Sequence, residues 1–575
     1  MRLNHFALLA ALAVPACFGQ LTTDQKVEDF KDLAALYDKN YGLYEWKKQA
    51  VGFDLLKTDA WLERVRASKT DLDFYEICVE YVASLQDTHS YYSVPSDFIA
   101  RLYVGFDVYD GKVLVEGINR TRLPAARFPF AIGDELVSVD GVAAEQLLKD
   151  FAKYGMNGNP RATRRFAAAW IGTRPQEVMP HASDLGDSAT VVIRRASGAE
   201  ETYTIPWVKT GTPVHAGPVP SPKKASVLRG AKRVDDADAP PISLGSDDAS
   251  LPGYEQAWRK LQLSADTRLE GLIGYGSRNP YYTLPTGFQV RLGAFASDYF
   301  VSGTYQSAGQ RIGYIRIPSY ATYSAAIQSQ FDREITFFQQ NTDGLVVDQT
   351  RNPGGLLCFG ENVVTRLVPN DFRAMGYQFR ASRSMLLFFY QNLQAARAAN
   401  ADQWMIDLWE SSFNQINEAY SQNRGQTGPL PICTPSLTRQ PAKDSAGRPL
   451  VYTKPLVMLV DELSTSTADS VPAMLQDAGR GILFGLRTNG AGGTNSSDYT
   501  GAYSEGFAGF TLGIMVRGKT ITTPEYPSGP FIENVGVRPD IEYDYMTREN
   551  LLNSGRPFVT AFTDAIVKAI QSGAQ

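Results

Sequence analysis

The sequence predicts a protein of mixed α/β architecture (class α+β) that is built from several parts. Its 575 residues are too many for one ordinary domain of roughly 150 residues. Apolar residues make up 43% of the chain and charged residues 20%, which is typical of a protein that folds around cores. The 29 Tyr and 29 Phe favour β-sheets, whereas the helical spacing of apolar residues within 21–85 favours helices near the start.

The first 19 residues have the pattern of a secretory signal peptide. Arg2 precedes an apolar stretch, Phe6 to Val14, and small residues follow. An alternative is a lipoprotein signal with a lipid on Cys17. No later run reaches the ~20 apolar residues that a membrane span needs, so we expect a secreted protein. The net charge of −5 argues against a nucleic-acid partner.

Changes of pattern along the chain indicate its organisation. We expect a signal peptide (1–19), an N-terminal helical part (20–98), a module of short strands (99–210), a flexible linker or insertion (211–299), a core (300–545, with a helical insertion at 383–424) and a C-terminal helix (546–575). In the strand-rich module, Ile132-Gly-Asp-Glu-Leu-Val-Ser-Val-Asp140-Gly141 resembles a PDZ-type module, although a generic hairpin also uses Asp-Gly. Prolines and mixed charges in 211–250 predict an exposed segment that proteases can cleave. Of the cysteines that follow the signal, Cys358 and Cys433 are the pair that we expect to form a disulfide, which export permits.

A strand–turn–helix phrase presents a candidate nucleophile, Ser466. The apolar run Leu456 to Val460 predicts a buried strand, and the Ser/Thr cluster after it suits a helix start. A serine on this turn lies beside unpaired backbone N–H groups and the positive end of the helix dipole. Those groups can stabilise the oxyanion that a serine nucleophile creates. The alternative is a helix cap without chemistry.

A serine nucleophile needs a base, and the chain has only four histidines. His5 belongs to the signal, His181 to a polar turn and His215 to the Pro-rich linker. His89 lies in an ordered, half-apolar segment and is the candidate; the alternative is a structural imidazole.

Two further groups complete a candidate site. The glycines of Asn352-Pro353-Gly354-Gly355 follow a buried strand and can turn backbone N–H groups toward an oxyanion. Glu533, just before a Gly/Pro turn, is a candidate carboxylate to orient the imidazole.

Five phrases occur in order: Asp348-x-x-Arg-Asn-Pro-Gly-Gly, Val460-Asp-x-x-Ser-x-Ser466-x-Ala-Asp, Gln476-Asp477-x-Gly-Arg480, Gly485-x-x-Thr488-x-Gly490 and Glu533-Asn-x-Gly-Val-x-Pro-Asp540. Together they resemble the tail-specific, C-terminal-processing serine peptidases over about residues 70–145 and 300–545. The resemblance implies a ClpP/crotonase-like core and a serine peptidase activity without a cofactor or metal. Members with a Ser–Lys dyad carry lysine where this chain has Ala491. The sequence therefore looks like the branch that uses Ser, His and Glu.

The resemblance implies a role for each matching residue. Ser466 is the expected nucleophile, His89 the base and Glu533 the orienting carboxylate, with Glu505 and Glu525 as rivals of Glu533. The amides of Gly354 or Gly355 and of Thr467 are the expected oxyanion donors. We expect an exported endopeptidase that acts on polypeptides, and by resemblance alone a homodimer. The alternatives are a catalytically silent peptide-binding protein and a hydrolase of small peptides or esters in a biosynthetic pathway.

Overall fold

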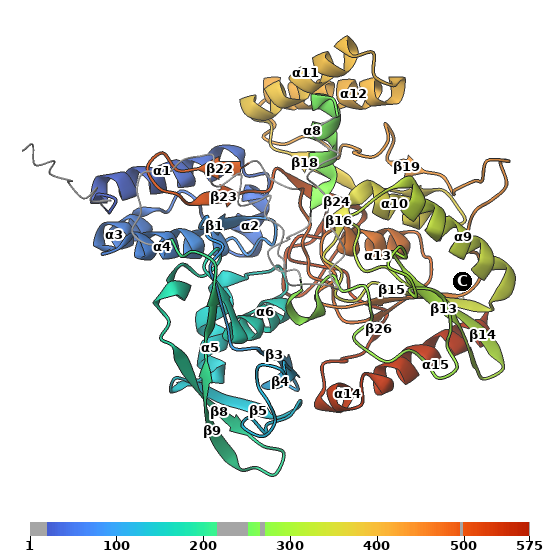
Figure 1. The fold of residues 1–575 in the computed structure, drawn as a ribbon. Coiled ribbons are helices and arrows are strands. Elements are labelled where there is room, and N and C mark those ends of the chain that lie inside the picture. Colours follow the sequence, from blue (N-terminus) through green and yellow to red (C-terminus); the bar gives the residue numbers. More distant parts are fainter. Residues whose placement is uncertain (1–19, 215–250, 265–270, 495–497, 574–575) are drawn as a thin grey trace, which may run out of the picture.

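The computed structural model describes residues 20–214, 251–264, 271–494 and 498–573, and it confirms the mixed α/β architecture (Figure 1). The predicted signal peptide with Cys17, and the part of the predicted linker from 215 to 250, lie outside the described residues. Among the helices of the described ranges, none combines the length and apolar composition that a bilayer crossing requires.

Helices form the N-terminal part, as its periodicity predicts: α1 (Thr23–Asn40), α2 (Tyr44–Ala50), α3 (Asp59–Ala67) and α4 (Asp71–Ala83). Thr22 and Thr70 begin α1 and α4 with capping boxes, which satisfy amides at the helix starts. The apolar faces of these helices pack against Phe510 and Val535 from the other end of the chain. Strand β1 (Tyr91–Ser93), just after α4, pairs with β23 (Phe507–Gly509), which also pairs with β22 (Asp498–Thr500). The N-terminal part therefore packs against the C-terminal half and pairs a strand with it.

A strand-rich module follows, with a sheet in the order β3-β4-β5-β8-β9. Its elements are β3 (Val104–Tyr109), β4 (Lys112–Ile118), β5 (Glu135–Val139), β6 (Val142–Ala143), α5 (Ala144–Phe151), α6 (Pro160–Gly172), β8 (Ser188–Arg194) and β9 (Glu200–Pro206). Strand β6 pairs with β5 across Asp140-Gly141, whose φ angles of 50° and 79° suit the predicted tight hairpin. A small sheet joins the module's ends: β2 (Ile99–Arg101), β7 (Thr173–Pro175) and β10 (Val208–Thr210).

The core contains a seven-stranded sheet in the order β12-β13-β14-β15-β20-β21-β26. Its strands are β12 (Gln289–Leu292), β13 (Val301–Ser307), β14 (Gln310–Arg316), β15 (Gly344–Asp348), β20 (Leu456–Val460), β21 (Ile482–Gly485) and β26 (Ile541–Glu542). Pairing is parallel from β14 to β26. Fully buried strands such as β15 and β20 read as continuous apolar runs because helices cover both faces.

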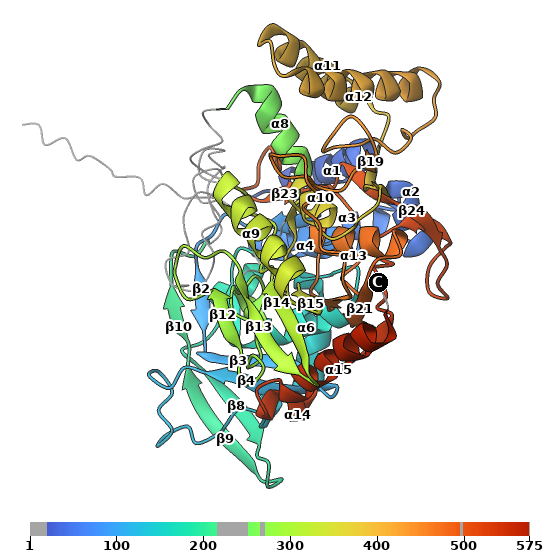
Figure 2. The ribbon, with the colours of Figure 1, turned by 90° about the vertical axis from the view of Figure 1, so that its right-hand side faces the viewer.

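The two faces of this sheet are covered by different helices (Figure 2). One face packs on α15 (Arg556–Ser572), which follows α14 (Arg548–Leu552). The other packs on α9 (Ala325–Asn341), α10 (Leu357–Thr365) and α13 (Thr467–Asp477). Short strands complete the core in three groups: β18 (Gly376–Phe379), β24 (Gly513–Ile521) and β25 (Gly529–Phe531); β17 (Phe372–Arg373) and β19 (Thr438–Arg439); β11 (Leu263–Ser264) and β16 (Gly355–Leu356).

The segment from 271 to 299 differs from the flexible linker that the sequence predicts. It contributes β12 to the seven-stranded sheet, and Tyr282 from it is buried against α15. The sequence does not indicate this strand, because the segment has many polar and glycine residues. An edge strand such as β12 needs few buried apolar side chains. Before it, α8 (Gly253–Gln262) leads into β11.

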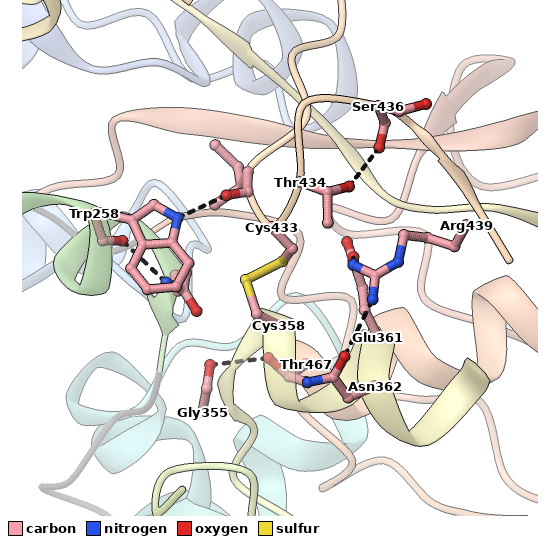
Figure 3. Close-up of a disulfide and its surroundings, with 12 residues drawn as sticks. Trp258, Gly355, Cys358, Glu361, Asn362, Cys433, Thr434, Ser436, Arg439 and Thr467 are labelled. Atoms are coloured by element: carbon pink, nitrogen blue, oxygen red, sulfur yellow. Dashed lines mark hydrogen bonds and ion pairs between the residues drawn. A yellow bond between two sulfur atoms is a disulfide. The ribbon is translucent and has the colours of Figure 1, made fainter. Parts of the chain in front are cut away.

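The predicted helical insertion is a hairpin of α11 (Arg383–Ala398) and α12 (Gln403–Ser421), which projects from the core (Figure 1). A disulfide joins Cys358 of α10 to Cys433 after the hairpin, which confirms the expected pairing (Figure 3). Cys78 is a buried thiol.

Candidate active site

Ser466 lies on the turn between β20 and α13, immediately before the first residue of the helix. Its φ of 61° is in the left-handed region, which a residue with a Cβ rarely adopts. The Ser466 amide donates to Asp469 Oδ2 at 2.6 Å, so the next turn of the helix holds this strained backbone in place. A sharp strand-to-helix turn of this kind is how α/β hydrolases present a serine.

Helix α13 has a proline in its interior, Pro472, and the structure compensates for it. Proline lacks an N–H, so the carbonyl of Ala468, four residues earlier, loses its helical partner. Gln349, the residue immediately after β15, donates its Nε2 to that carbonyl at 2.7 Å. The helix that begins at the candidate nucleophile is therefore tied to the neighbouring strand.

The predicted glycine turn packs directly on the nucleophile turn. A Cβ added to Gly354 would lie 2.9 Å from Ser466 Cβ and 3.1 Å from the Thr467 amide, so only glycine allows this approach. Thr467 Oγ1 donates to the Gly355 carbonyl at 2.9 Å (Figure 3). The Gly354 amide donates to Asn352 Oδ1 at 2.8 Å, and it is thus engaged within its own turn.

His89 lies in the buried turn between α4 and β1, whose centre is the carboxylate of Asp87. Asp87 accepts from the His89 amide, the Tyr41 and Ser90 hydroxyls and Thr511 Oγ1 at 2.7 to 2.9 Å. Its Oδ1 is 4.0 Å from His89 Nδ1. Burial alone would raise the pKa of Asp87, but the charges of Lys47 and His89 and these hydrogen bonds hold the pKa below its ordinary value. The turn is therefore rigid and negatively charged beside the imidazole.

Asn489 connects the turn of His89 to the turn of Ser466. Its Oδ1 accepts from the Thr88 hydroxyl at 2.9 Å, next to His89. Its backbone amide donates to the Ser464 carbonyl at 2.9 Å and its Nδ2 to the Glu462 carbonyl at 3.2 Å. Segments nearly 380 residues apart in sequence thus meet at one side chain.

The four residues after Asn489 contact Asp469, Glu533 and His89. The amides of Gly490 and Ala491 donate to Asp469 at 2.8 and 3.1 Å, and Asp469 also accepts from Ser466. The Gly492 amide donates to Glu533 Oε2 at 2.7 Å. A Cβ added to Gly493 would lie 3.3 Å from His89 Nδ1, so the imidazole lies against this glycine.

Glu533 is fully buried and forms an ion pair with Lys47 of α2. Burial raises the pKa of Glu533 to about 8, the nearby Asp87 raises it too, and Lys47 and the Gly492 amide act in the opposite direction. The rival Glu525 is exposed and pairs with Arg538 at 2.8 Å. Glu505 lies in the segment whose backbone contacts Tyr75 of α4.

Several residues of this site carry no signal that sequence reasoning used. Asp469 and Asn489 stand inside the quoted phrases and Asp87 lies two residues before His89, but their polar side chains are equally common in turns. Lys47 stands in an ordinary helical segment, and its partner is 486 residues away. In the described part of the chain, no three His, Cys, Asp or Glu side chains are placed to share a metal ion.

Comparisons with known proteins agree with this architecture. Residues 311–543 match the model of peptidase family S41, and residues 101–213 match a PDZ domain. The chain is a serine-type peptidase with an S41 domain. This finding confirms the resemblance to the C-terminal-processing peptidases and the PDZ-like module.

The relatives of this peptidase include proteins of similar length. It is 24% identical to a protein of Chlamydia pneumoniae over 99% of its own length and 94% of the relative's. It is 24% identical to the chloroplastic C-terminal processing peptidase of Tetradesmus obliquus, over 41% of this chain and 36% of that one. Among solved structures, mature CPAF matches with a TM-score of 0.74 at 18% identity and covers 96% of this chain and 99% of its own. The peptidase thus shares the fold of mature CPAF over nearly its whole length.

Proposed function

We propose that this peptidase is an exported serine endopeptidase that hydrolyses polypeptides with Ser466, His89 and Glu533. The observation that carries the proposal is the bonding of Asn489 to both the turn of His89 and the turn of Ser466. The residues after Asn489 contact Glu533 and the imidazole of His89. The proposal thus assigns the three roles to residues from three segments that all contact the short loop 489–493.

In the proposed reaction, His89 takes the proton of the Ser466 hydroxyl while Ser466 Oγ attacks the peptide carbonyl carbon. The tetrahedral intermediate collapses when His89 gives that proton to the leaving amine, and an acyl-enzyme remains. Water, activated by His89 in the same way, then releases the second product. Glu533 holds the imidazole and stabilises its positive charge.

The proposed oxyanion donors are backbone amides on two packed turns. Thr467 begins α13 directly after Ser466, and Gly354, just before Gly355 at the start of β16, packs against Ser466. We assign the role to the amide of Thr467 together with that of Gly354 or Gly355; the Gly354 amide donates to Asn352 within its own turn. Removal of one oxyanion donor typically costs about 3 kcal/mol of transition-state stabilisation.

Cleavage between 211 and 250 is part of this proposal, although residues 215–250 lie outside the described ranges. Strand β11 pairs antiparallel with β16, with Ser264 opposite Gly355. A strand of the same chain therefore lies along the strand that carries a proposed oxyanion donor, where an extended substrate would bind. Cleavage before β11 would allow it to leave. Intact-mass analysis of active protein is expected to show two fragments, and an unbroken active chain would overturn this step.

The experiment that tests the proposal compares casein hydrolysis by the wild type, Ser466→Ala and His89→Ala. We expect both substitutions to abolish hydrolysis and the exposed control Ser421→Ala to retain it. A fluorophosphonate probe is expected to label the wild type and not Ser466→Ala. A folded wild type that is neither labelled nor active after cleavage at 211–250 would favour the silent peptide-binding alternative. Labelling with turnover on short peptides or esters but not on casein would favour the biosynthetic hydrolase.

A further inference from the structure

Lys47 is a lysine whose side chain is completely buried. Charged ammonium groups are almost never buried in this way unless partners surround them. Its Nζ pairs with Glu533 Oε1 and donates to Asn534 Oδ1 and to the Gln86 carbonyl, each at 2.8 Å. These three acceptors belong to two separate segments, the turn that carries Glu533 and the turn that leads to His89.

The neighbours of Lys47 strengthen this connection. Trp46 donates its Nε1 to the Glu533 carbonyl at 3.0 Å, and its ring packs on Phe531. Asn534 donates its Nδ2 to the Gln86 carbonyl at 3.1 Å. Gln86 and Asn534 both have positive φ, 50° and 62°, so each segment bends sharply where Lys47 holds it. Helix α2 therefore fixes the distance between the two segments.

The charges around Lys47 explain why an ammonium is needed there. Two buried carboxylates, Asp87 and Glu533, raise each other's energy when both are ionised. The other titratable groups near them are Tyr41, which donates to Asp87, Tyr37, whose pKa is raised by burial and by the charge of Asp87, and His89. Lys47 pairs with Glu533 and donates to the carbonyl of Gln86, the residue before Asp87, and its charge lowers the pKa of both carboxylates.

We propose that Lys47 is a positioning residue of the site: it holds the Glu533 carboxylate against the turn that carries His89. This inference rests on the proposed function, because it assigns Lys47 a role through Glu533 and not through contact with the substrate. The alternative is a lysine that contributes to folding alone.

The pH dependence of kcat/KM distinguishes these roles. Glu533 can stabilise a protonated imidazole only when its carboxylate is ionised. Because the pKa of Glu533 is raised to about 8, the activity of the wild type should increase with pH through about 8. Loss of the ammonium removes an effect that lowers this pKa. Lys47→Met should therefore move the rise by at least about one pH unit upward and reduce kcat/KM at pH 7 at least tenfold. Lys47→Arg, which keeps the charge, should restore much of the activity at pH 7.

The matched control is Lys48→Met, on the same helix but exposed, which should leave both activity and pH profile unchanged. Thermal unfolding of each variant shows whether it is folded. A folded Lys47→Met with the wild-type profile would overturn the proposal. If Lys47→Met does not fold, Lys47→Arg and Glu533→Gln decide: the proposal requires that Glu533→Gln remove the rise near pH 8, and a retained rise overturns it. Casein hydrolysis by Ser466→Ala is measured in parallel, because activity there would refute the proposed function itself.

Discussion

At the scale of one residue, burial and a neighbouring charge have opposite effects on the pKa of Glu361. Its carboxylate is buried in α10 and pairs with Arg439 at 2.9 Å, close to the disulfide (Figure 3). Burial raises the pKa of Glu361 to about 7 in spite of the arginine. The ion pair therefore does not fully compensate the carboxylate for its loss of water.

This raised pKa predicts how stability depends on pH. The unfolded chain has an ordinary Glu pKa, so the contribution of Glu361 is fully present below about pH 4.5 and is lost as pH rises through about 7. We expect the loss to be on the order of 3 kcal/mol. Glu361→Gln should remove this part of the slope, which urea denaturation at pH 5 and pH 8 measures. An unchanged slope in the variant would contradict the prediction.

At the scale of an element, Pro472 of α13 and Gln349, the residue immediately after β15, are expected to be coupled energetically. Gln349→Met should leave the Ala468 carbonyl buried without its side-chain donor and lower the free energy of unfolding by about 1–3 kcal/mol. Pro472→Ala restores an N–H to the helix, so Gln349→Met should be less harmful in that background. A double-mutant cycle by urea denaturation measures the coupling. Additive effects would show that the two residues act separately.

The PDZ domain presents an edge strand, β3, that is already covered. PDZ domains bind a peptide as an added strand, but here α6 lies against β3, and a Cβ on Gly172 would be 2.2 Å from the Val104 carbonyl oxygen. Arg165 of α6 forms a buried ion pair with Asp107 of β3 and also contacts Glu462, near the nucleophile turn. This arrangement suits a domain that supports the core.

We therefore expect that fluorescence anisotropy detects no saturable binding of a labelled peptide with a free C-terminal carboxylate to this groove. The same peptide with an amidated C-terminus is the control, because a PDZ groove requires the carboxylate and an active site of an endopeptidase does not. Saturable binding that amidation removes would contradict a closed groove.

At the scale of the whole molecule, the disulfide joins residues 75 apart and encloses the projecting α11–α12 hairpin. A crosslink of this span restricts the unfolded chain and is expected to contribute about 4 kcal/mol. Replacement of Cys358 and Cys433 together by serine should lower the free energy of unfolding by up to this amount in urea denaturation. Wild type in reductant should approach the double variant. Equal stability of the oxidised wild type and the variant would contradict the prediction.

The sequence predicts some levels of this molecule better than others. The strand, turn and helix around Ser466 follow from a local apolar run and hydroxyl caps, and few histidines compete with His89. The sequence predicts a linker where strand β12 forms, because this edge strand buries few side chains and lacks an apolar run. Lys47 could not be found, since its helix has ordinary local features and only the folded chain brings it to Glu533.

The contact between Lys47 and Glu533 also sets an order of events during synthesis. The two residues are separated by 486 positions, and a ribosome needs roughly 25 to 100 seconds to add that many. Throughout that time the nascent chain holds the ammonium without its carboxylate. In the proposed mechanism the site is complete only after translation has passed Glu533, so a nascent chain that stops before this residue is expected to lack peptidase activity.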